Sequence, residues 1–223
     1  MSLTLDKLKV IHIPVTPLRQ NCTLLMDLDN DQAILVDPGG NGEKILKVIK
    51  ENNANVKEIW ITHCHFDHIG AANFVSEHLK INVVGPAIED KLLLQYDVID
   101  IARGYGIYDD TIQNVTIEKF LADGDIVTCG MYEFKVLHTP GHAPGHVIFF
   151  CEKLQFAIMG DVLFRGSIGR TDLIGSNHAD LIRSLNNKVL PLGDNVQFIC
   201  GHGPGSTILY ERLHNPFLQV FNQ

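Results

Sequence analysis

Apolar residues occur in short runs separated by polar turns along this chain of 223 residues. Three early runs, LKVIHI (8–13), CTLLMDL (22–28) and AILVD (33–37), have the length and apolar content of strands. The third run stops at Pro38-Gly39-Gly40, and helical spacing begins at about Gly42. The apolar face of that predicted helix consists of Ile45, Leu46, Val48 and Ile49.

The middle of the chain returns to strand-like runs after a second helix. VKEIWIT (56–62) predicts a buried strand, helical spacing resumes over 69–79, and a short strand is expected near Val83. Residues 86–116 are mixed and predict a helix followed by a long loop. Four further strands are expected at DIVTC (125–129), YEFKVLHT (132–139), HVIFFC (146–151) and LQFAIMGD (154–161).

The last part of the chain predicts a helix, a strand and a short terminal helix. The first helix is capped near Ser176 or Asn177, and VQFIC (196–200) is the strand. The chain has no strong repeat or linker, so one domain over 1–223 is expected. Two strand-rich blocks with connections too short for parallel crossovers favour two sheets packed face to face, with helices outside.

Composition excludes several classes of partner. The formal net charge is −8, and the Lys and Arg residues form no stripe of the kind that binds nucleic acid. No apolar run approaches the roughly 20 residues of a membrane span, and MSLTLDKLKV lacks a targeting signal. The five cysteines include no C-x-x-C pair and sit mostly in apolar runs, which indicates buried thiols and a cytoplasmic protein.

The segment THCHFDHIG (62–70) concentrates metal-binding side chains in one turn. In an extended segment alternate residues face the same side, so His63, His65 and Asp67 are expected to converge. The following helix start would bring His68 to them, and Gly70 would let the backbone pass close by. Neutral imidazole and carboxylate are ligands of divalent cations, so the turn predicts a metal site.

Later turns offer further ligands at the ends of strands. HTPGHAPGH contains His138, His142 and His146, and spacing alone does not choose among them. LQFAIMGD ends at Asp161, and CGHGPG contains His202.

The motifs T-H-x-H-x-D-H, G-H, G-D and G-H-G-P in this order resemble the metallo-β-lactamase superfamily over nearly the whole chain. The resemblance implies an α/β (α+β) fold, a four-layer αββα sandwich, with two divalent metal ions at one edge of the sheets. Zinc is expected first, with iron or manganese as alternatives. The implied ligands are His63, His65 and His142 for one metal, and Asp67, His68 and His202 for the other, with Asp161 bridging both.

A binuclear site of this kind activates water. Two metals about 3.5–4 Å apart lower the pKa of a bridging water to about 7 and stabilise a developing oxyanion. No nucleophilic Ser or Cys is required, and Asp67 could also orient the hydroxide. A non-catalytic zinc domain is the alternative from another class, but structural zinc sites are closed and four-coordinate.

The segment GDVLFRGSIGRTDL (160–173) resembles the glyoxalase II branch, hydroxyacylglutathione hydrolases, in its short bacterial form without the C-terminal helical domain. That branch hydrolyses S-D-lactoylglutathione to D-lactate and glutathione through the bridging hydroxide. Two local departures from the branch pattern are Ile174-Gly175-Ser176 and Cys200-Gly201. Persulfide dioxygenases share the G-R-T-D signature and would hold one iron through His63, His142 and Asp161, which is the alternative reading.

Other residues are candidates for supporting roles. Asp37 and His146 are candidates for orienting ligands. Arg170 is a third candidate, although an ion pair with Asp172 is the stronger expectation. The pair Tyr105 and Tyr108 is expected to pack in the long loop rather than line a substrate site.

Overall fold

The computed structural model describes residues 2–219, and its first sheet holds six strands from the N-terminal half. In chain order they are β1 (Ser2–Leu5), β2 (Leu8–Val15), β3 (Gln20–Asp27), β4 (Gln32–Val36), β5 (Val56–Trp60) and β6 (Asn82–Val84). Neighbours in the sheet follow the chain order. Strands β1 to β4 pair antiparallel, whereas β4, β5 and β6 run parallel.

The second sheet holds the strands of the C-terminal half in the order β14-β13-β10-β9-β8-β7. They are β7 (Ile126–Cys129), β8 (Tyr132–His138), β9 (Val147–Cys151), β10 (Phe156–Ile158), β13 (Gln197–Ile199) and β14 (Ser206–Thr207). Only the β10–β13 pair is parallel within this described sheet. A separate hairpin is formed by β11 (Leu163–Phe164) and β12 (Ser167–Ile168).

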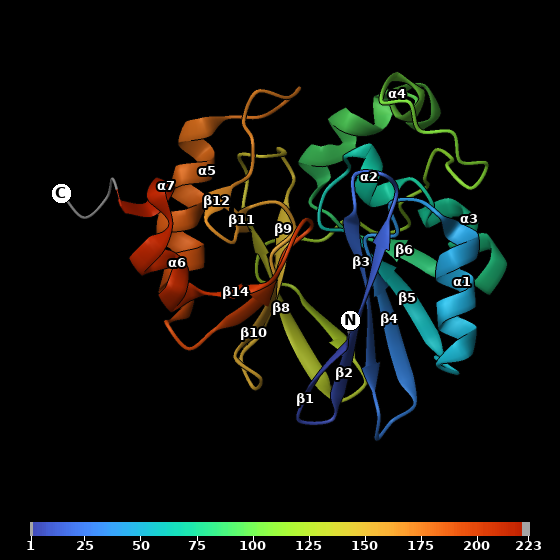
Figure 1. Cartoon of the computed structure of the whole chain (residues 1–223), viewed down its shortest axis with the longest axis horizontal. Coiled ribbons are helices and arrows are strands. Elements are labelled where there is room, and N and C mark those ends of the chain that lie inside the picture. The colour runs from blue at the N-terminus through green and yellow to red at the C-terminus, as the bar shows by residue number, and fades with distance from the viewer. Residues whose placement is uncertain (1, 220–223) are drawn as a thin grey trace.

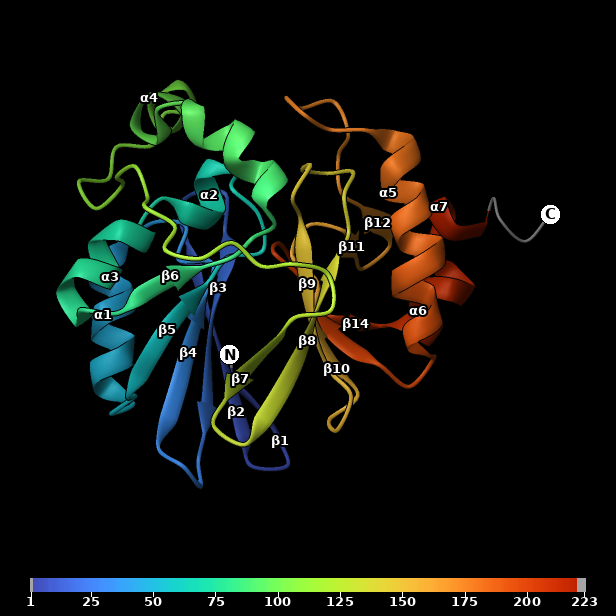
Figure 2. The same cartoon turned by 180° about the vertical axis from the view of Figure 1, so that it is seen from behind.

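Helices cover the outer face of each sheet, which makes four layers (Figure 1 and, from behind, Figure 2). The first sheet carries α1 (Gly42–Glu51), α2 (Phe66–Ile69), α3 (Ala72–Leu79), the 3-10 helix η1 (Ile88–Gln95) and α4 (Val98–Gly104). The second carries α5 (His178–Ser184), the π-helix η2 (Leu185–Val189), η3 (Leu190–Leu192), α6 (Ile208–His214) and α7 (Pro216–Gln219). The predicted sandwich is confirmed.

The core between the sheets is aromatic. Trp60 at the end of β5 is fully buried and meets two rings of the other sheet. Its ring centroid lies 5.4 Å from that of Phe134 on β8 and 5.1 Å from that of Phe149 on β9. Such aromatic pairs add about 0.5–1.5 kcal/mol beyond the burial of area. Trp60 therefore packs the first sheet against the second. It lies two residues before the start of the histidine-rich turn, so this packing also supports the turn.

The structure differs from the predicted elements in three places. Residues 86–116 contain two helices, η1 and α4, because Asp97 between them accepts hydrogen bonds from the backbone N–H groups of Ile99 and Asp100 and starts a new helix. The helix predicted over 69–79 begins three residues later, as α3 at Ala72, and Ile69 is instead the last residue of the separate short helix α2. Strands β1, β11, β12 and β14 were not predicted, since none of them lies in an apolar run of strand length.

Two further expectations concern cysteines and membranes. All five cysteines are buried and free, which confirms the predicted buried thiols. Among residues 2–219 no helix has the length and apolar character needed to cross a membrane.

Candidate metal centre

The predicted ligands gather at one edge of the sandwich because they follow strands that end there. The turn after β5 carries His63 and His65, and helix α2 carries Asp67 and His68. Asp161 follows β10 and His202 follows β13, its parallel neighbour. His142 comes from the loop between β8 and β9. The turns that follow the carboxyl ends of parallel strands lie at the same edge of a sheet, which is where α/β proteins bind their ligands.

One expectation about this turn is wrong in detail. Asp67 was expected to continue an extended segment, but the extended backbone ends at His65, which precedes the first turn of α2. Asp67 reaches the cluster from the helix, next to His68. Gly70 does allow a close approach, as predicted: a Cβ atom there would lie 2.5 Å from the carbonyl oxygen of Gly39.

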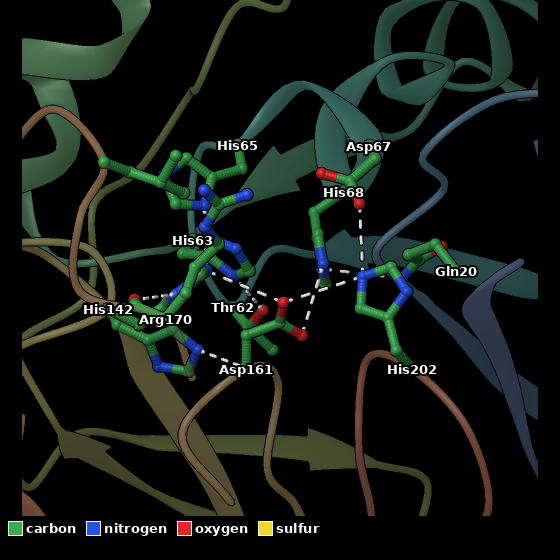
Figure 3. A network of polar contacts seen from close by, with 12 residues as sticks. Gln20, Thr62, His63, His65, Asp67, His68, His142, Asp161, Arg170 and His202 are labelled. Carbon is green, nitrogen blue, oxygen red and sulfur yellow. Dashed lines mark hydrogen bonds and ion pairs between the residues drawn. The ribbon is translucent and has the colours of Figure 1, made fainter. Parts of the chain in front are cut away.

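All seven predicted ligands lie in three overlapping groups whose ligand atoms are within 4.8 Å of one another. The groups are His63 with His65 and His142; His63 with His68 and Asp161; and Asp67 with His68 and His202. Figure 3 shows these side chains converging, with Asp161 between the two outer groups.

Asp161 faces imidazoles of both outer groups. Its Oδ1 lies 3.4 Å from Nε2 of His68, and its Oδ2 lies 3.6 Å from Nε2 of both His142 and His202. Across the first group, Nδ1 of His65 is 2.9 Å from Nε2 of His142. One carboxylate thus reaches both groups, which is the position required of a bridging ligand.

Asp37 fixes the orientation of two histidines. It lies directly after β4 and accepts a hydrogen bond from Nδ1 of His68 at 2.9 Å. It also accepts from the hydroxyl and the backbone N–H of Thr62, both at 2.7 Å. Because the Thr62 hydroxyl gives its proton to Asp37, its oxygen accepts from Nδ1 of His63, 3.0 Å away. Both imidazoles therefore carry their proton on Nδ1 and turn Nε2 toward the cluster.

Two of the remaining imidazoles are oriented by backbone carbonyl groups. Nδ1 of His142 donates to the carbonyl oxygen of Arg170 at 2.8 Å. Nδ1 of His202 donates to the carbonyl oxygen of Leu18 at 3.3 Å. Arg170 thus supports His142 through its main chain, while its guanidinium pairs with Asp172 at 2.7 Å, as the sequence predicted.

His146 is buried beside the cluster but turns its lone pair elsewhere. Its Nε2 accepts a hydrogen bond of 3.0 Å from the backbone N–H of Asp161. Its Nδ1 therefore carries the proton and donates to the Thr139 hydroxyl, 3.2 Å away. The third histidine of the turn, His138, pairs through Nε2 with the carbonyl oxygen of Pro144. Among the three, His142 is the one that joins a described ligand group.

Divalent cations fit this arrangement, as the unpaired buried atoms show. Nε2 of His63, Nε2 of His68 and Oδ1 of Asp161 are buried and have no hydrogen-bond partner. Leaving a buried polar atom unpaired costs about 1–3 kcal/mol. Two imidazole lone pairs and a carboxylate oxygen aimed at the same space would each be satisfied by a cation.

The charges of the cluster agree with this fit. Burial and neighbouring histidines lower the pKa of His63 well below its usual range and that of His65 to about 3, so both are neutral ligands at pH 7. Burial opposes ionisation of Asp161, yet His68 and His142 lower its pKa. Burial also opposes protonation of His68, but Asp161 and Asp37 raise its pKa well above normal. The ionised carboxylates thus favour positive charge on the neighbouring imidazoles. Bound metal ions would supply that charge in place of the imidazole protons.

Two neighbouring residues, Gly201 and Asp90, help to hold the candidate ligands in place. A Cβ atom on Gly201 would collide with Asp161 Oδ1 and with the ring of His68, so only glycine fits there. Asp90 of η1 is fully buried and accepts hydrogen bonds from the backbone N–H of Cys64, at 2.7 Å, and from that of Gly145. It ties the turn that carries His63 and His65 to the loop that carries His142.

Several residues of the site carry no signal in the sequence. Thr62 and Asp90 were not singled out, nor was Gln20, whose buried amide nitrogen lies 3.4 Å from Nδ1 of His68. Nothing about a threonine or glutamine at a strand end distinguishes it in the sequence. Tyr105 was expected only to pack, but it also lines the pocket beside the ligands. Tyr108 is 83% exposed and does not line that pocket.

Comparison with known proteins agrees with the arrangement. A family model described as the metallo-beta-lactamase superfamily matches residues 15–202. Hydroxyacylglutathione hydrolase GloC of Haemophilus influenzae is 39% identical over 212 residues, covering 92% of this chain and 96% of that protein. Probable metallo-hydrolase YqgX of Bacillus subtilis is 37% identical over 212 residues, covering 95% of this chain and 98% of that protein.

Two solved structures are similar over nearly the whole chain. The B3 metallo-beta-lactamase BLEG-1 superposes with a TM-score of 0.84 at 36% identity, covering 94% of this chain and 99% of that one. TTHA1623, solved in a di-iron-bound form, superposes with a TM-score of 0.83 at 34% identity, covering 93% and 100%.

Proposed function

The chain belongs to the metallo-β-lactamase superfamily, and we propose that it is a binuclear metal-dependent thioester hydrolase of the hydroxyacylglutathione hydrolase type. The superfamily and the metallo-hydrolase relatives make it a metallo-hydrolase. The number of metals and the thioester are our proposal. Zinc is the metal we expect first, with iron or manganese as alternatives that suit the same mixture of imidazole and carboxylate.

The observation that carries the proposal is the assembly of both ligand groups on one pocket. His63, His65 and His142 would hold one metal, and Asp67, His68 and His202 the other, with Asp161 between them. A persulfide dioxygenase would need only His63, His142 and Asp161. What favours the hydrolase is the segment LFRGSIGRTDL (163–173), which lies closer to the glyoxalase II pattern.

A bound pair of divalent metals would supply a water of lowered pKa and an electrophile for a carbonyl oxygen. The residues supply the rest. Burial opposes ionisation of Asp67, but its hydrogen bond from His202, at 3.1 Å, lowers its pKa, so the carboxylate stays ionised. Asp67 also faces the pocket. It can therefore accept a hydrogen bond from the attacking water at a carboxylate oxygen and orient that water toward the substrate.

The overall reaction balances without any other reactant. Water adds its oxygen to the thioester carbonyl carbon, the carbon–sulfur bond breaks, and the products are a carboxylic acid and a free thiol. No protein nucleophile is needed. Cys64, the cysteine among the pocket's described lining residues, is a poor nucleophile because burial raises the pKa of its thiol well above normal.

The hydroxyacylglutathione branch is supported by similarity. GloC of Haemophilus influenzae carries that activity in its name and aligns with 92% of this chain. A second candidate is β-lactam hydrolysis, since BLEG-1 is named a B3 metallo-beta-lactamase and is 36% identical. The five buried free thiols are compatible with the reducing cytoplasm proposed from the sequence.

The test is hydrolysis of S-D-lactoylglutathione by protein loaded separately with zinc, iron or manganese. The reaction is monitored through the thiol that it releases. A chelator-treated sample and the Asp161→Ala variant are the controls. We expect chelator-sensitive turnover that the variant lacks. No turnover with two metals verified per chain would exclude this substrate. A β-lactam measured in parallel tests the second candidate, and oxygen uptake with glutathione persulfide on the iron-loaded protein tests the dioxygenase.

A further inference from the structure

A cavity of about 580 Å³ opens directly over the candidate metal centre. Its floor consists of His65, Asp67, His142, Asp161 and His202, which are all candidate ligands. Pockets for small organic ligands have volumes of about 300–1,000 Å³. The cavity is therefore large enough to take a substrate group that extends well beyond the reacting carbonyl.

One wall of this cavity is apolar and is attached to the ligand turn. Phe66 lies in the chain between two candidate ligands, and the ring of Tyr105 stacks on it with centroids 5.1 Å apart. Leu93 of η1 and Ile101 of α4 extend the same wall. Although it is packed on Phe66, Tyr105 is 55% exposed.

The opposite wall comes from the hairpin β11–β12 and the segment after it. Phe164, Ile168, Leu173 and Ile174 line it, and Ile174 is 56% exposed. Both views of the fold show this segment and the η1–α4 segment on opposite sides of the edge where the two sheets meet (Figures 1 and 2). Large apolar side chains left exposed together in a concave site mark a ligand surface.

Charge is scarce on these walls. Arg170 is the one Lys or Arg among the described lining residues. Its guanidinium is already engaged by Asp172 through two hydrogen bonds, Nε to Oδ1 at 2.7 Å and Nη2 to Oδ2 at 2.8 Å. Glutathione presents two carboxylates and an ammonium group. Binding both of its carboxylates tightly would require several cationic donors, whereas the described lining offers a single guanidinium, already engaged on one edge by Asp172.

We infer that the cavity selects thioesters carrying an apolar group next to the scissile bond, so that short polar acyl groups and the charged ends of glutathione contribute little to recognition. The inference rests on the proposed thioester hydrolysis and names the substrate class of the same site. The apolar group is either the acyl chain or the thiol substituent, since both adjoin the carbonyl over the cavity floor.

The size of the expected effect follows from burial of apolar surface. Burying one methylene is worth about 0.8 kcal/mol, or about fourfold in a rate constant. Because the walls are partly open to solvent, we expect kcat/KM to rise about two- to fourfold per added methylene until the cavity is filled.

The experiment measures kcat/KM of the metal-loaded protein on two thioester series. The first varies the acyl chain from acetyl to octanoyl on N-acetylcysteamine, and the second keeps acetyl and lengthens an alkyl thiol. A rise in either series supports the inference and identifies which side of the bond enters the cavity. The same rise is expected to be flattened in Ile174→Asn and kept in Leu213→Asn, a matched exposed leucine outside the cavity.

Other results would overturn it. If both series are flat while S-D-lactoylglutathione is hydrolysed well, the apolar selection is wrong and the proposed function stands. If S-D-lactoyl-N-acetylcysteamine is more than about tenfold poorer than S-D-lactoylglutathione, the protein recognises glutathione itself, and the inference is again wrong. If no thioester is hydrolysed, both the proposed function and the inference are wrong.

Discussion

The backbone N–H of Asp161 donates a hydrogen bond of 3.0 Å to Nε2 of His146. This contact occupies the lone pair of His146 and at the same time sets the position of the carboxylate that lies between the two ligand groups. His146 is thereby a residue that positions Asp161, whereas His142, four residues earlier, turns its own Nε2 into the cluster.

The two histidines of this loop are therefore expected to respond differently to substitution. His142→Ala removes a proposed ligand, and we expect nearly complete loss of turnover and of one metal. His146→Ala removes an orienting partner, which typically costs about 10–100-fold in affinity or activity. Metal content and kcat of both variants, compared side by side, check the difference. Equal losses would mean that the wrong histidine has been chosen as the ligand.

Asp161→Ala tests the bridging carboxylate. We expect the variant to retain at most one metal per chain and to lose turnover by about a thousandfold or more, because the metal chemistry is worth several kcal/mol. The fold should persist, since the Trp60 core lies between the sheets. Elemental analysis, circular dichroism and turnover are the measurements, with Asp123→Ala, an exposed partner of Lys188, as the control. Full activity in the variant would remove Asp161 from the site.

Asp37→Asn tests the proton positions on His63 and His68. Asp37 has a φ of 50°, a conformation that asparagine also adopts readily, so the backbone should not change. The new amide group would face the Thr62 hydroxyl and Nδ1 of His68, which would shift the His68 proton to Nε2 and block its lone pair. We expect metal affinity about 10–100-fold weaker. Competition with a fluorescent chelator measures it, and unchanged affinity would contradict this role.

Asp90→Asn tests the link between the two ligand loops. The carboxylate accepts one backbone N–H on each oxygen, whereas the amide can accept on one side only. The other side would set two donors against each other in a fully buried position. We expect the free energy of unfolding to fall by about 1–3 kcal/mol. Urea titration measures it, with Asp97→Asn, an exposed helix cap on the same segment, as the control. No destabilisation would show that the link is dispensable.

The candidate ligands could be listed from the sequence because the residue type and the position at a strand end coincide in them. Histidines and aspartates that end apolar runs are unusual, and strand ends meet at one edge of a sheet. The choice of His142 over His146 could not be made from spacing, since it depends on which lone pair the backbone of Asp161 occupies. In the same way, the role of the Arg170 carbonyl depends on the fold and not on the arginine side chain.

Other parts of the site were beyond sequence reasoning because they rest on contacts between distant segments. Asp90 lies 26 residues from Cys64 and 55 from Gly145, inside a stretch whose spacing suggested an ordinary helix. Tyr105 lines the cavity only because α4 carries it onto Phe66. The two-residue strands β11, β12 and β14 were missed because two residues show no periodicity, whereas the three-residue strands β10 and β13 lie inside longer apolar runs.

The most direct test of a binuclear hydrolase is stepwise addition of metal to chelator-stripped protein while S-D-lactoylglutathione hydrolysis is followed. We predict that activity continues to rise until two metal ions are bound per chain and is constant beyond that point. Full hydrolytic activity with one ion bound, or no hydrolysis with two, would contradict the account.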